Sequence, residues 1–151
     1  MINSFDGDYA FLSNFYPSEI IYGIGDNGGV LIARTVEHAF QAAKAEKREE
    51  ELEILKASTP GQAKKWGRRC VIREDWEVIK NSVMYNYVNR KFANSELRQK
   101  LLDTGNEYLE EGNTWHDNYW GNCYCERCAN IKGRNKLGEI LMTIREKIRN
   151  G

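Results

Sequence analysis

The sequence lacks an excess of charge of either sign and lacks any long apolar run. Its 22 Lys and Arg residues balance 22 Asp and Glu residues, which argues against a nonspecific grip on nucleic-acid backbones. No stretch approaches the roughly 20 apolar residues that span a bilayer. The first residues, MINSFDGDYAF, have neither the basic start nor the apolar core of a secretory signal. We therefore expect a cytoplasmic protein that does not contact membranes.

Proline is scarce, and repeats, linkers and low-complexity tracts are absent. Only two prolines occur in 151 residues, and 41% of the residues are hydrophobic. This composition excludes a disordered chain and predicts one domain over residues 1–151. Neutral charge still allows an enzyme that recognises a single nucleotide in a pocket.

Cysteine is scarce too, and it is unevenly spread. Cys70 stands alone, whereas Cys123, Cys125 and Cys128 are crowded together. Disulfides are not expected in an intracellular chain of this length. The three thiols could form a tetrahedral zinc site with His116 or Cys70, but no second paired cluster exists, so free thiols are favoured. We expect no required cofactor and no catalytic cysteine.

The hydrophobic pattern predicts an α+β fold that is mainly helical with a small antiparallel or mixed sheet. Two β-branched runs, residues 20–22 and 30–32, flank the turn sequence GDNGG, which is typical of a hairpin. Thr35 is the expected N-cap of a helix that reaches about residue 56. The other expected elements are a strand over residues 69–73 and helices over residues 60–65, 75–92, 95–105 and 136–149, with Ser95 and Asn135 as N-caps.

A polar stripe lies on the helix predicted after residue 35. At 100° per residue, Glu37, Gln41 and Lys44 fall within about 60° of one another. The alternative is an ordinary solvated face, but Phe40 lies beside the stripe and the more charged half of the helix comes later. These two features favour a pocket. His38 lies off the stripe, near the helix start, and is expected to be a core or capping histidine.

The predicted loop over residues 111–134 is rich in Trp, Asn, Gly and Cys. Long loops in small domains are often functional. Trp115, Trp120 and Asp117 could form a stacking wall with hydrogen-bonding groups, as a purine or ribose requires; alternatively, the aromatic residues pack and Asp117 caps a turn. Residues 133–135 open the last helix, and the N–H groups of a helix start suit a phosphate, although every helix has such an end.

Taken together, these segments resemble the YbiA-like, or NADAR, family over nearly the whole chain and in the same order. The matching segments are residues 11–17 (FLSNFYP), 36–44 (VEHAFQAAK), 63–68 (AKKWGR), 75–76 (DW), 91–92 (KF), 101–105 (LLDTG), 117–121 (DNYWG) and 133–142 (GRNKLGEILM). Residues 122–130, which hold the three cysteines, depart from the pattern, since shorter glycine-bearing loops also occupy this place.

The resemblance implies a helical α+β fold and N-glycosidase activity on ribosides that carry phosphate. Two substrate classes are associated with the family: ribosylamino-pyrimidine phosphates of early riboflavin synthesis, and ADP-ribose attached to the amino group of guanine in nucleic acid. We favour the guanine adduct, because the aromatic loop is generous for a single pyrimidine. The partner would be ADP-ribosylated nucleic acid or a phosphoribosyl small molecule. A module that binds ADP-ribose without turnover is the non-enzymatic alternative.

The resemblance also implies roles for individual residues. Lys44 would act as a nucleophile that forms a Schiff base with the sugar, and Glu37 and Asp117 would transfer protons or bind ribose hydroxyls. In a rival mechanism the ring stays closed, two carboxylates serve an oxocarbenium-like sugar, and Lys44 only orients the substrate. The residues assigned to substrate binding are Asn14, Phe15, Gln41, Arg68, Trp115, Trp120, Gly121 and Asn135.

Overall fold

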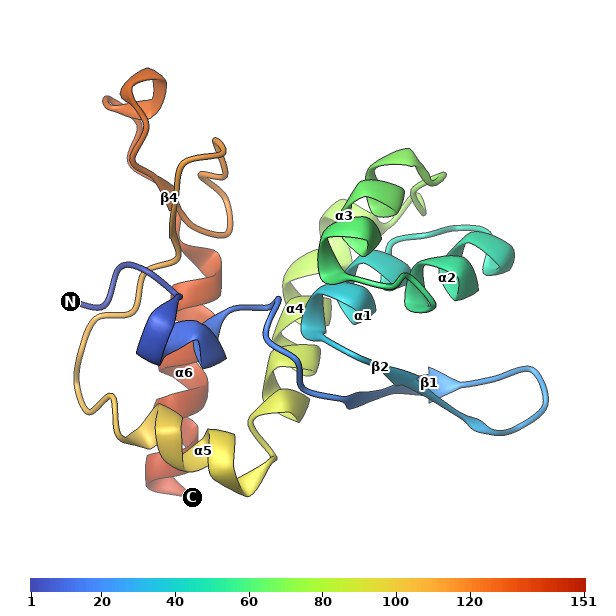
Figure 1. Ribbon diagram of the computed structural model, residues 1–151, viewed down its shortest axis with the longest axis horizontal. Coiled ribbons are helices and arrows are strands. Elements are labelled where there is room, and N and C mark those ends of the chain that lie inside the picture. The colour runs from blue at the N-terminus through green and yellow to red at the C-terminus, as the bar shows by residue number, and fades with distance from the viewer. The chain divides into compact units, whose positions relative to one another are not determined.

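The computed structural model describes all residues, 1–151. Residues 14–91 form one compact unit, and residues 1–13 together with 92–151 form a second. Helices dominate both units, and the strands are few and short (Figure 1). This confirms the predicted α+β class. No helix has both the length and the apolar character needed to cross a membrane.

The unit of residues 14–91 begins with the predicted hairpin. Strand β1, Ile20–Ile24, pairs antiparallel with β2, Val30–Ala33. Gly25 N donates to Gly29 O at 2.6 Å, and Gly28 adopts a φ of +84°, a conformation that glycine accepts without strain. The turn sequence therefore fixes the hairpin where it was predicted.

Helix α1, Val36–Ala43, is shorter than predicted, and α2, Arg48–Leu55, is a separate helix. The expectation of one helix to residue 56 is wrong, because residues 44–46 pair with residues 71–73. Arg73 N donates to Lys44 O at 3.0 Å, and Glu46 N donates to Val71 O at 2.8 Å. The predicted strand over residues 69–73 is reduced to a bridge at Ile72.

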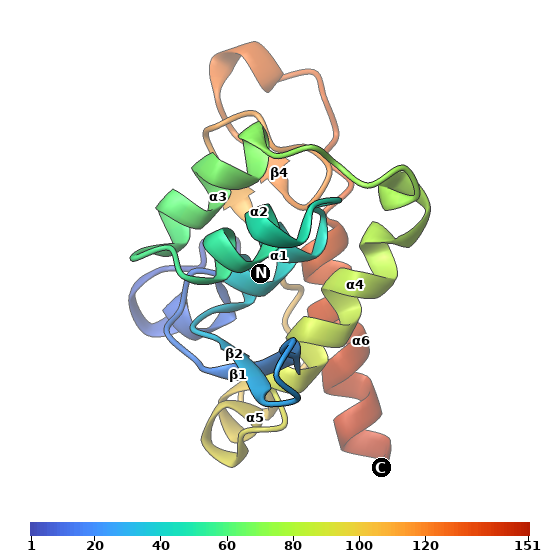
Figure 2. The same ribbon diagram turned by 90° about the vertical axis from the view of Figure 1, so that its right-hand side faces the viewer.

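Helix α3, Pro60–Arg69, starts where predicted but runs further. Thr59 Oγ1 accepts from Gln62 N at 3.0 Å, and proline occupies the first turn, where it costs no hydrogen bond. Helices α1, α2 and α3 pack against one another, and α1 also packs on α4, Trp76–Lys91 (Figures 1 and 2).

Helix α4 has the predicted extent, but its buried side is rotated from the predicted one. It buries Trp76, Met84, Val88 and Lys91. The expected side was residues 76, 79, 83 and 87, with Met84 as a further member. The ambiguity arises because apolar residues occur almost all round this helix.

The unit of residues 1–13 and 92–151 is built around the last helix. Its elements are the 3-10 helix Gly7–Leu12, α5 (Ser95–Leu102), the parallel pair β3 (Gly112–Asn113) and β4 (Asn122–Cys123), the 3-10 turn Glu126–Cys128, and α6 (Lys136–Asn150). Leu137, Leu141 and Ile144 of α6 are buried, as its apolar stripe predicts. Helix α5 is capped by Asn94, not by Ser95: Asn94 Oδ1 accepts from the backbone N–H groups of residues 96 and 97.

Candidate functional site

The polar stripe of α1 is buried, which excludes the solvated alternative. Glu37 is 7% exposed and Gln41 6%. Gln41 Nε2 donates to Glu37 Oε1 at 2.9 Å. This pairing fixes the orientation of the Gln41 amide, because a carboxylate oxygen can only accept. Gln41 Oε1 is buried and accepts no hydrogen bond from the chain. Such an unpaired buried acceptor costs stability in the folded protein.

Lys44 is half-buried at the C-terminal end of the same helix. Burial is the largest influence on its amine and lowers its pKa below the usual value. Interactions with Cys70 and Glu37 raise the pKa, while those with Arg68 and Lys64 lower it further. A lowered pKa increases the share of the neutral amine, which is the form that acts as a nucleophile.

Helix α3 brings two cations and a close packing point to this stripe. A Cβ added at Gly67 would overlap Gln41 Oε1, so glycine is what allows α3 to approach α1 here. Lys64 Nζ lies 6.0 Å from the centre of the Phe15 ring, and Arg68 is exposed. Phe15 is 42% exposed. Helix α3 thus places the charges of Lys64 and Arg68 close enough to act on Lys44.

Asn14 and His38 support the start of α1. Asn14 O accepts from Glu37 N at 3.1 Å, and its Nδ2 donates to Met84 Sδ at 3.4 Å. His38 is 1% exposed; Nε2 faces Ala57 O at 2.9 Å, so Nε2 carries the proton and Nδ1 pairs with Thr35 Oγ1 at 2.8 Å. Burial lowers the pKa of His38. This confirms the expected capping and core role of the histidine.

The loop of the other unit holds Asp117 in a turn. Asp117 Oδ1 accepts from Tyr119 N at 3.0 Å and from Trp120 N at 2.9 Å. Asn113 binds the backbone of Asp117: its Nδ2 donates to Asp117 O at 2.8 Å, and its Oδ1 accepts from Asp117 N at 3.2 Å. The turn-capping arrangement is therefore present. A proton-transfer role for Asp117 stays a prediction.

The two tryptophans predicted to stack differ in exposure. Trp115 is 55% exposed, whereas Trp120 is half-buried and meets Tyr119 edge-to-face, with ring centres 4.8 Å apart. Gly121 is buried, and a Cβ there would overlap Glu111 O. Close backbone packing explains the glycine without a ligand.

The start of α6 does not offer the free N–H groups that a phosphate cradle needs. Gly133 N donates to Asn122 Oδ1 at 2.8 Å, and the N–H groups of residues 134–137 donate to carbonyls of residues 118, 121, 119 and 120. Asn135 stands at the predicted N-cap position with a φ of +51°, but its side chain makes no capping bond. Instead it binds Glu111 N and Leu109 O. These N–H groups are thus already used within the chain, which argues against a backbone phosphate site, and substrate contact by Asn135 stays a prediction.

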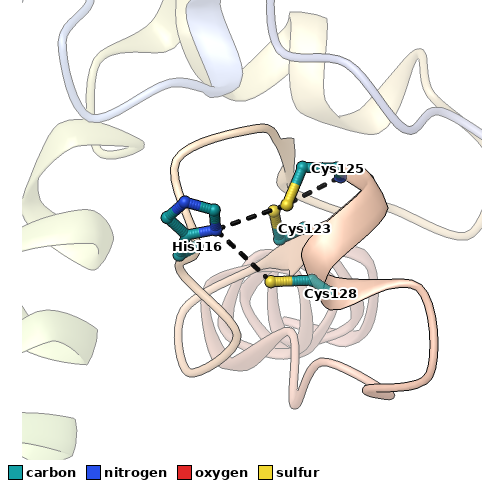
Figure 3. A group of neighbouring side chains, drawn as sticks. All are labelled: His116, Cys123, Cys125 and Cys128. Atoms are coloured by element: carbon teal, nitrogen blue, oxygen red, sulfur yellow. Dashed lines mark hydrogen bonds between the residues drawn. The ribbon is translucent and has the colours of Figure 1, made fainter.

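The cysteine-rich segment brings four metal-binding side chains together. The ligand atoms of His116, Cys123, Cys125 and Cys128 all lie within 4.8 Å of one another (Figure 3). Cys70 is not a member: its Sγ donates to Gly67 O at 3.3 Å, and it neighbours Lys44. Of the two fourth ligands considered from the sequence, the structure selects His116.

Several residues that shape the α1 stripe and the turn at Asp117 were not assigned a role from the sequence. Lys64 and Gly67 lie within a segment that the family resemblance had already marked, residues 63–68. Cys70 was noticed only for its thiol, and its place beside Lys44 depends on tertiary packing. Asn113 lies in the polar and aromatic segment that the sequence marked, but its bonds to the backbone of Asp117 depend on the folded turn.

Comparison with known proteins finds relatives that are named N-glycosidases, in agreement with the predicted enzyme class. An N-glycosidase of Nostoc punctiforme, Npun_R5314, is 39% identical over 148 residues, which cover 94% of this chain and 87% of the relative. The solution NMR structure of the Escherichia coli protein YbiA covers 99% of this chain and 86% of its own, with a TM-score of 0.79 and 33% identity. A riboflavin biosynthesis protein of Vibrio vulnificus is 34% identical over 146 residues, 95% of this chain but 36% of that longer protein. The NADAR domain model matches residues 3–149. The chain belongs to the NADAR domain family.

Proposed function

We propose that the protein hydrolyses the bond between C1 of a phosphorylated ribose and an amino group of a base, with Lys44 as nucleophile. The observation that carries this proposal is the half-buried Lys44, with its lowered pKa, on the same helix face as the buried Glu37–Gln41 pair. The N-glycosidase name of a relative that spans nearly the whole chain supports the reaction class.

The reaction begins with the opening of the ribose ring. The bond from C1 to the ring oxygen breaks, that oxygen takes a proton, and C1 becomes an imine of the base amine. The neutral Lys44 amine adds to C1, and the base amine leaves with a proton, so the sugar is now held as a Schiff base on Lys44. Water then adds to C1 and the lysine amine departs. The net change is one water consumed, with free base and free sugar released.

Glu37 and Gln41 are suited to hold the sugar during these steps. Glu37 Oε1 is fixed by the Gln41 amide, which leaves the carboxylate oriented to accept from a ribose hydroxyl or to move a proton. The same bond holds the Gln41 amide, whose Oε1 packs against Gly67. We assign the phosphate of the ribose to the cationic side chains of Lys64 and Arg68, whose charges act on Lys44.

Within this class we favour ADP-ribose on guanine as the substrate and ADP-ribosylated nucleic acid as the partner. Phe15 in one unit and Trp115 in the other each expose an aromatic ring, and each ring is suited to stack on a base. Neutral net charge is compatible with a nucleic-acid lesion recognised mainly through its flipped-out adduct. Asn14, Asp117 and Trp120 are further candidates for substrate contact.

Hydrolysis of ribosylamino-pyrimidine phosphates is the second candidate. The riboflavin-biosynthesis name of the Vibrio vulnificus relative supports it. The bond broken is the same, an amine on C1 of a phosphorylated ribose, so the same lysine chemistry would serve both substrates.

A parallel hydrolysis assay separates the candidates. Wild type is offered a guanine-ADP-ribosylated oligonucleotide and a ribosylamino-pyrimidine phosphate, and products are identified by mass spectrometry. Release of ADP-ribose supports the first candidate, and release of ribose 5-phosphate alone supports the second. Binding of the adduct without cleavage of either substrate would contradict both and leave a binding module.

Borohydride reduction during turnover tests the nucleophile. A sugar adduct mapped to Lys44 by peptide mass spectrometry is the expected result, with Lys65→Ala as a control because Lys65 is an exposed lysine of α3. Turnover without any trapped adduct, together with activity retained by Lys44→Arg, would favour the closed-ring mechanism, in which the lysine only orients the substrate.

A further inference from the structure

The side chains of His116, Cys123, Cys125 and Cys128 converge on one point. Figure 3 shows the imidazole facing the sulfur atoms of the cysteines. His116 Nδ1 lies 3.3 Å from Cys125 Sγ and 3.5 Å from Cys128 Sγ. In a tetrahedral zinc site, with bonds of about 2.3 Å to sulfur and about 2.0 Å to nitrogen, the edge from nitrogen to sulfur is about 3.5 Å. The two distances from His116 to sulfur therefore match the edges of such a site, and all four ligand atoms lie within 4.8 Å of one another.

We propose that these four side chains bind one structural Zn²⁺ ion. Three thiolates and one imidazole are the donors that zinc prefers, whereas Mg²⁺ and Ca²⁺ require oxygen ligands. Four protein ligands complete a tetrahedron, which is typical of structural rather than catalytic zinc. Each thiol loses its proton to solvent on binding, so three protons are released, and the ion with its three thiolates and neutral imidazole carries one net negative charge.

The backbone around the cluster supports the same assignment independently. His116 adopts a φ of +70°, a left-handed conformation that costs energy for a residue with a side chain. The residue with this strained backbone is the one whose imidazole contacts the thiols of Cys125 and Cys128. Cys125 N lies 3.5 Å from Cys123 Sγ, an N–H···S contact of the kind that stabilises a thiolate ligand from outside the coordination sphere.

The proposed ion would cross-link the loop at its two ends. His116 directly precedes Asp117, while Cys123 belongs to β4 and Cys128 closes the 3-10 turn. The strand pair β3–β4 that links these parts has only two residues in each strand. A zinc ion would therefore supply the rigidity that so short a sheet lacks. This role does not depend on the proposed glycosidase activity.

Metal content and uptake by the full chain test the proposal. Protein purified without chelator is expected to contain one zinc ion per chain, measured by elemental mass spectrometry. After removal of zinc with a chelator under reducing conditions, Co²⁺ is expected to bind with 1:1 stoichiometry. The bound cobalt should show sulfur-to-cobalt charge-transfer absorption and the intense visible bands of a tetrahedral site. Absence of zinc and no cobalt uptake by the reduced protein would overturn the proposal.

Differential alkylation identifies the ligands without any substitution. Cys123, Cys125 and Cys128 are expected to be protected in the zinc-loaded protein and to react after chelation. Cys70 provides an internal control, because it lies in the other unit and its reactivity should not respond to the chelator. Equal alkylation of the three cysteines with and without zinc, or a disulfide among them together with no metal uptake after reduction, would contradict the assignment.

Variants then test each ligand. Cys125→Ser and His116→Ala should weaken zinc binding by about 100-fold or more, measured by competition with a chromophoric chelator. His116→Cys should retain zinc, with a stronger charge-transfer band on cobalt substitution, and Cys70→Ser should retain it unchanged. Undiminished binding in both Cys125→Ser and Cys128→Ser would place the metal elsewhere and overturn the proposal. If a variant does not fold, the metal uptake and alkylation of wild type still decide.

Discussion

Helix α1 and the loop over residues 113–123 both present candidate catalytic groups, but they position them by different means. On α1, the backbone itself brings residues 37, 41 and 44 to one face, and a single side-chain bond joins Glu37 to Gln41. In the loop, the turn around Asp117 is built from side-chain bonds to backbone groups, chiefly those of Asn113 and Asp117. On α1, replacing one side chain should therefore leave the other groups in place, because the helix backbone positions them. In the loop, the position of Asp117 depends on individual side chains.

The largest effect is expected from Lys44, which α1 supplies. Lys44→Ala should lower the turnover rate by more than about 1,000-fold, because it removes the nucleophile, while the urea unfolding midpoint changes little. Lys44→Arg should be equally inactive, since a guanidinium keeps its proton. Lys65→Ala should behave as wild type. An active Lys44→Arg would show that a charge, and not a nucleophile, is what α1 delivers.

Lys91 sharpens the comparison because it is a buried lysine outside the α1 stripe. It is 2% exposed, burial lowers its pKa to about 7, and Tyr16 lies 5.7 Å away. In the unfolded chain the Lys91 amine takes up a proton as pH falls through about 10.5, whereas in the folded chain it does so only near pH 7. Between these values the unfolded state binds more protons, so the free energy of unfolding decreases as pH decreases. Lys91→Met should therefore be more stable than wild type by about 5 kcal/mol at pH 6.

The measurement for Lys91 is urea unfolding of both proteins from pH 6 to pH 10. The stability difference should shrink steadily as pH rises and should be small near pH 10. A difference that is the same at every pH would mean that packing, and not the charge of the amine, governs this position.

Gly67→Ala tests the packing that holds the α1 stripe. The added Cβ would displace the Gln41 side chain, at an expected cost of about 2 kcal/mol in unfolding free energy and with a fall in turnover. Gly61→Ala is the matched control, because it lies in the same helix with only Thr59 Oγ1 within 4 Å. That control should be neutral or slightly stabilising, since alanine favours the helix. Equal effects of the two changes would rule out a special role for the approach of α3.

Asn113→Ala tests the loop and has the smallest expected effect. It removes the acceptor for the N–H groups of residues 115 and 117 and the donor to Asp117 O, so a loss of about 1–2 kcal/mol is expected. Asn130→Ala, an exposed position, should change stability by less than about 0.5 kcal/mol. Urea unfolding and amide exchange at residues 115 and 117 provide the measurement. If both variants match wild type, the loop is held by something other than these bonds.

The parts of the fold that follow local rules were predictable, and the parts set by tertiary pairing were not. Thr59 and Pro60 mark the start of α3, and the apolar stripe marks α6. The break after α1 has no local signal, because the segment from residue 44 to 46 leaves the helix to pair with residues 71–73. The shared helix face of Glu37 and Gln41 could likewise be predicted from their spacing. The close approach of Gly67 to Gln41 could not, because it depends on how α3 packs against α1.

Polar loops are harder still to predict, because each side chain has several backbone partners within reach. Asn135 was expected to cap α6 and to contact phosphate, yet its side chain binds residues 109 and 111. The sequence shows that Cys123, Cys125 and Cys128 are residues of a kind that binds metals. Only the folded turn shows that His116, and not Cys70, is the fourth member of the group.

The way α6 begins has a consequence for local unfolding. Because the loop supplies the acceptors for five consecutive amide hydrogens, from residue 133 to residue 137, loop and first helical turn share one set of bonds. Opening the loop would strip all five at once and uncover the positive end of the helix dipole. The two segments are therefore coupled into one cooperative opening unit, and their amides should exchange with solvent at a common rate even though one belongs to a loop and the other to a helix.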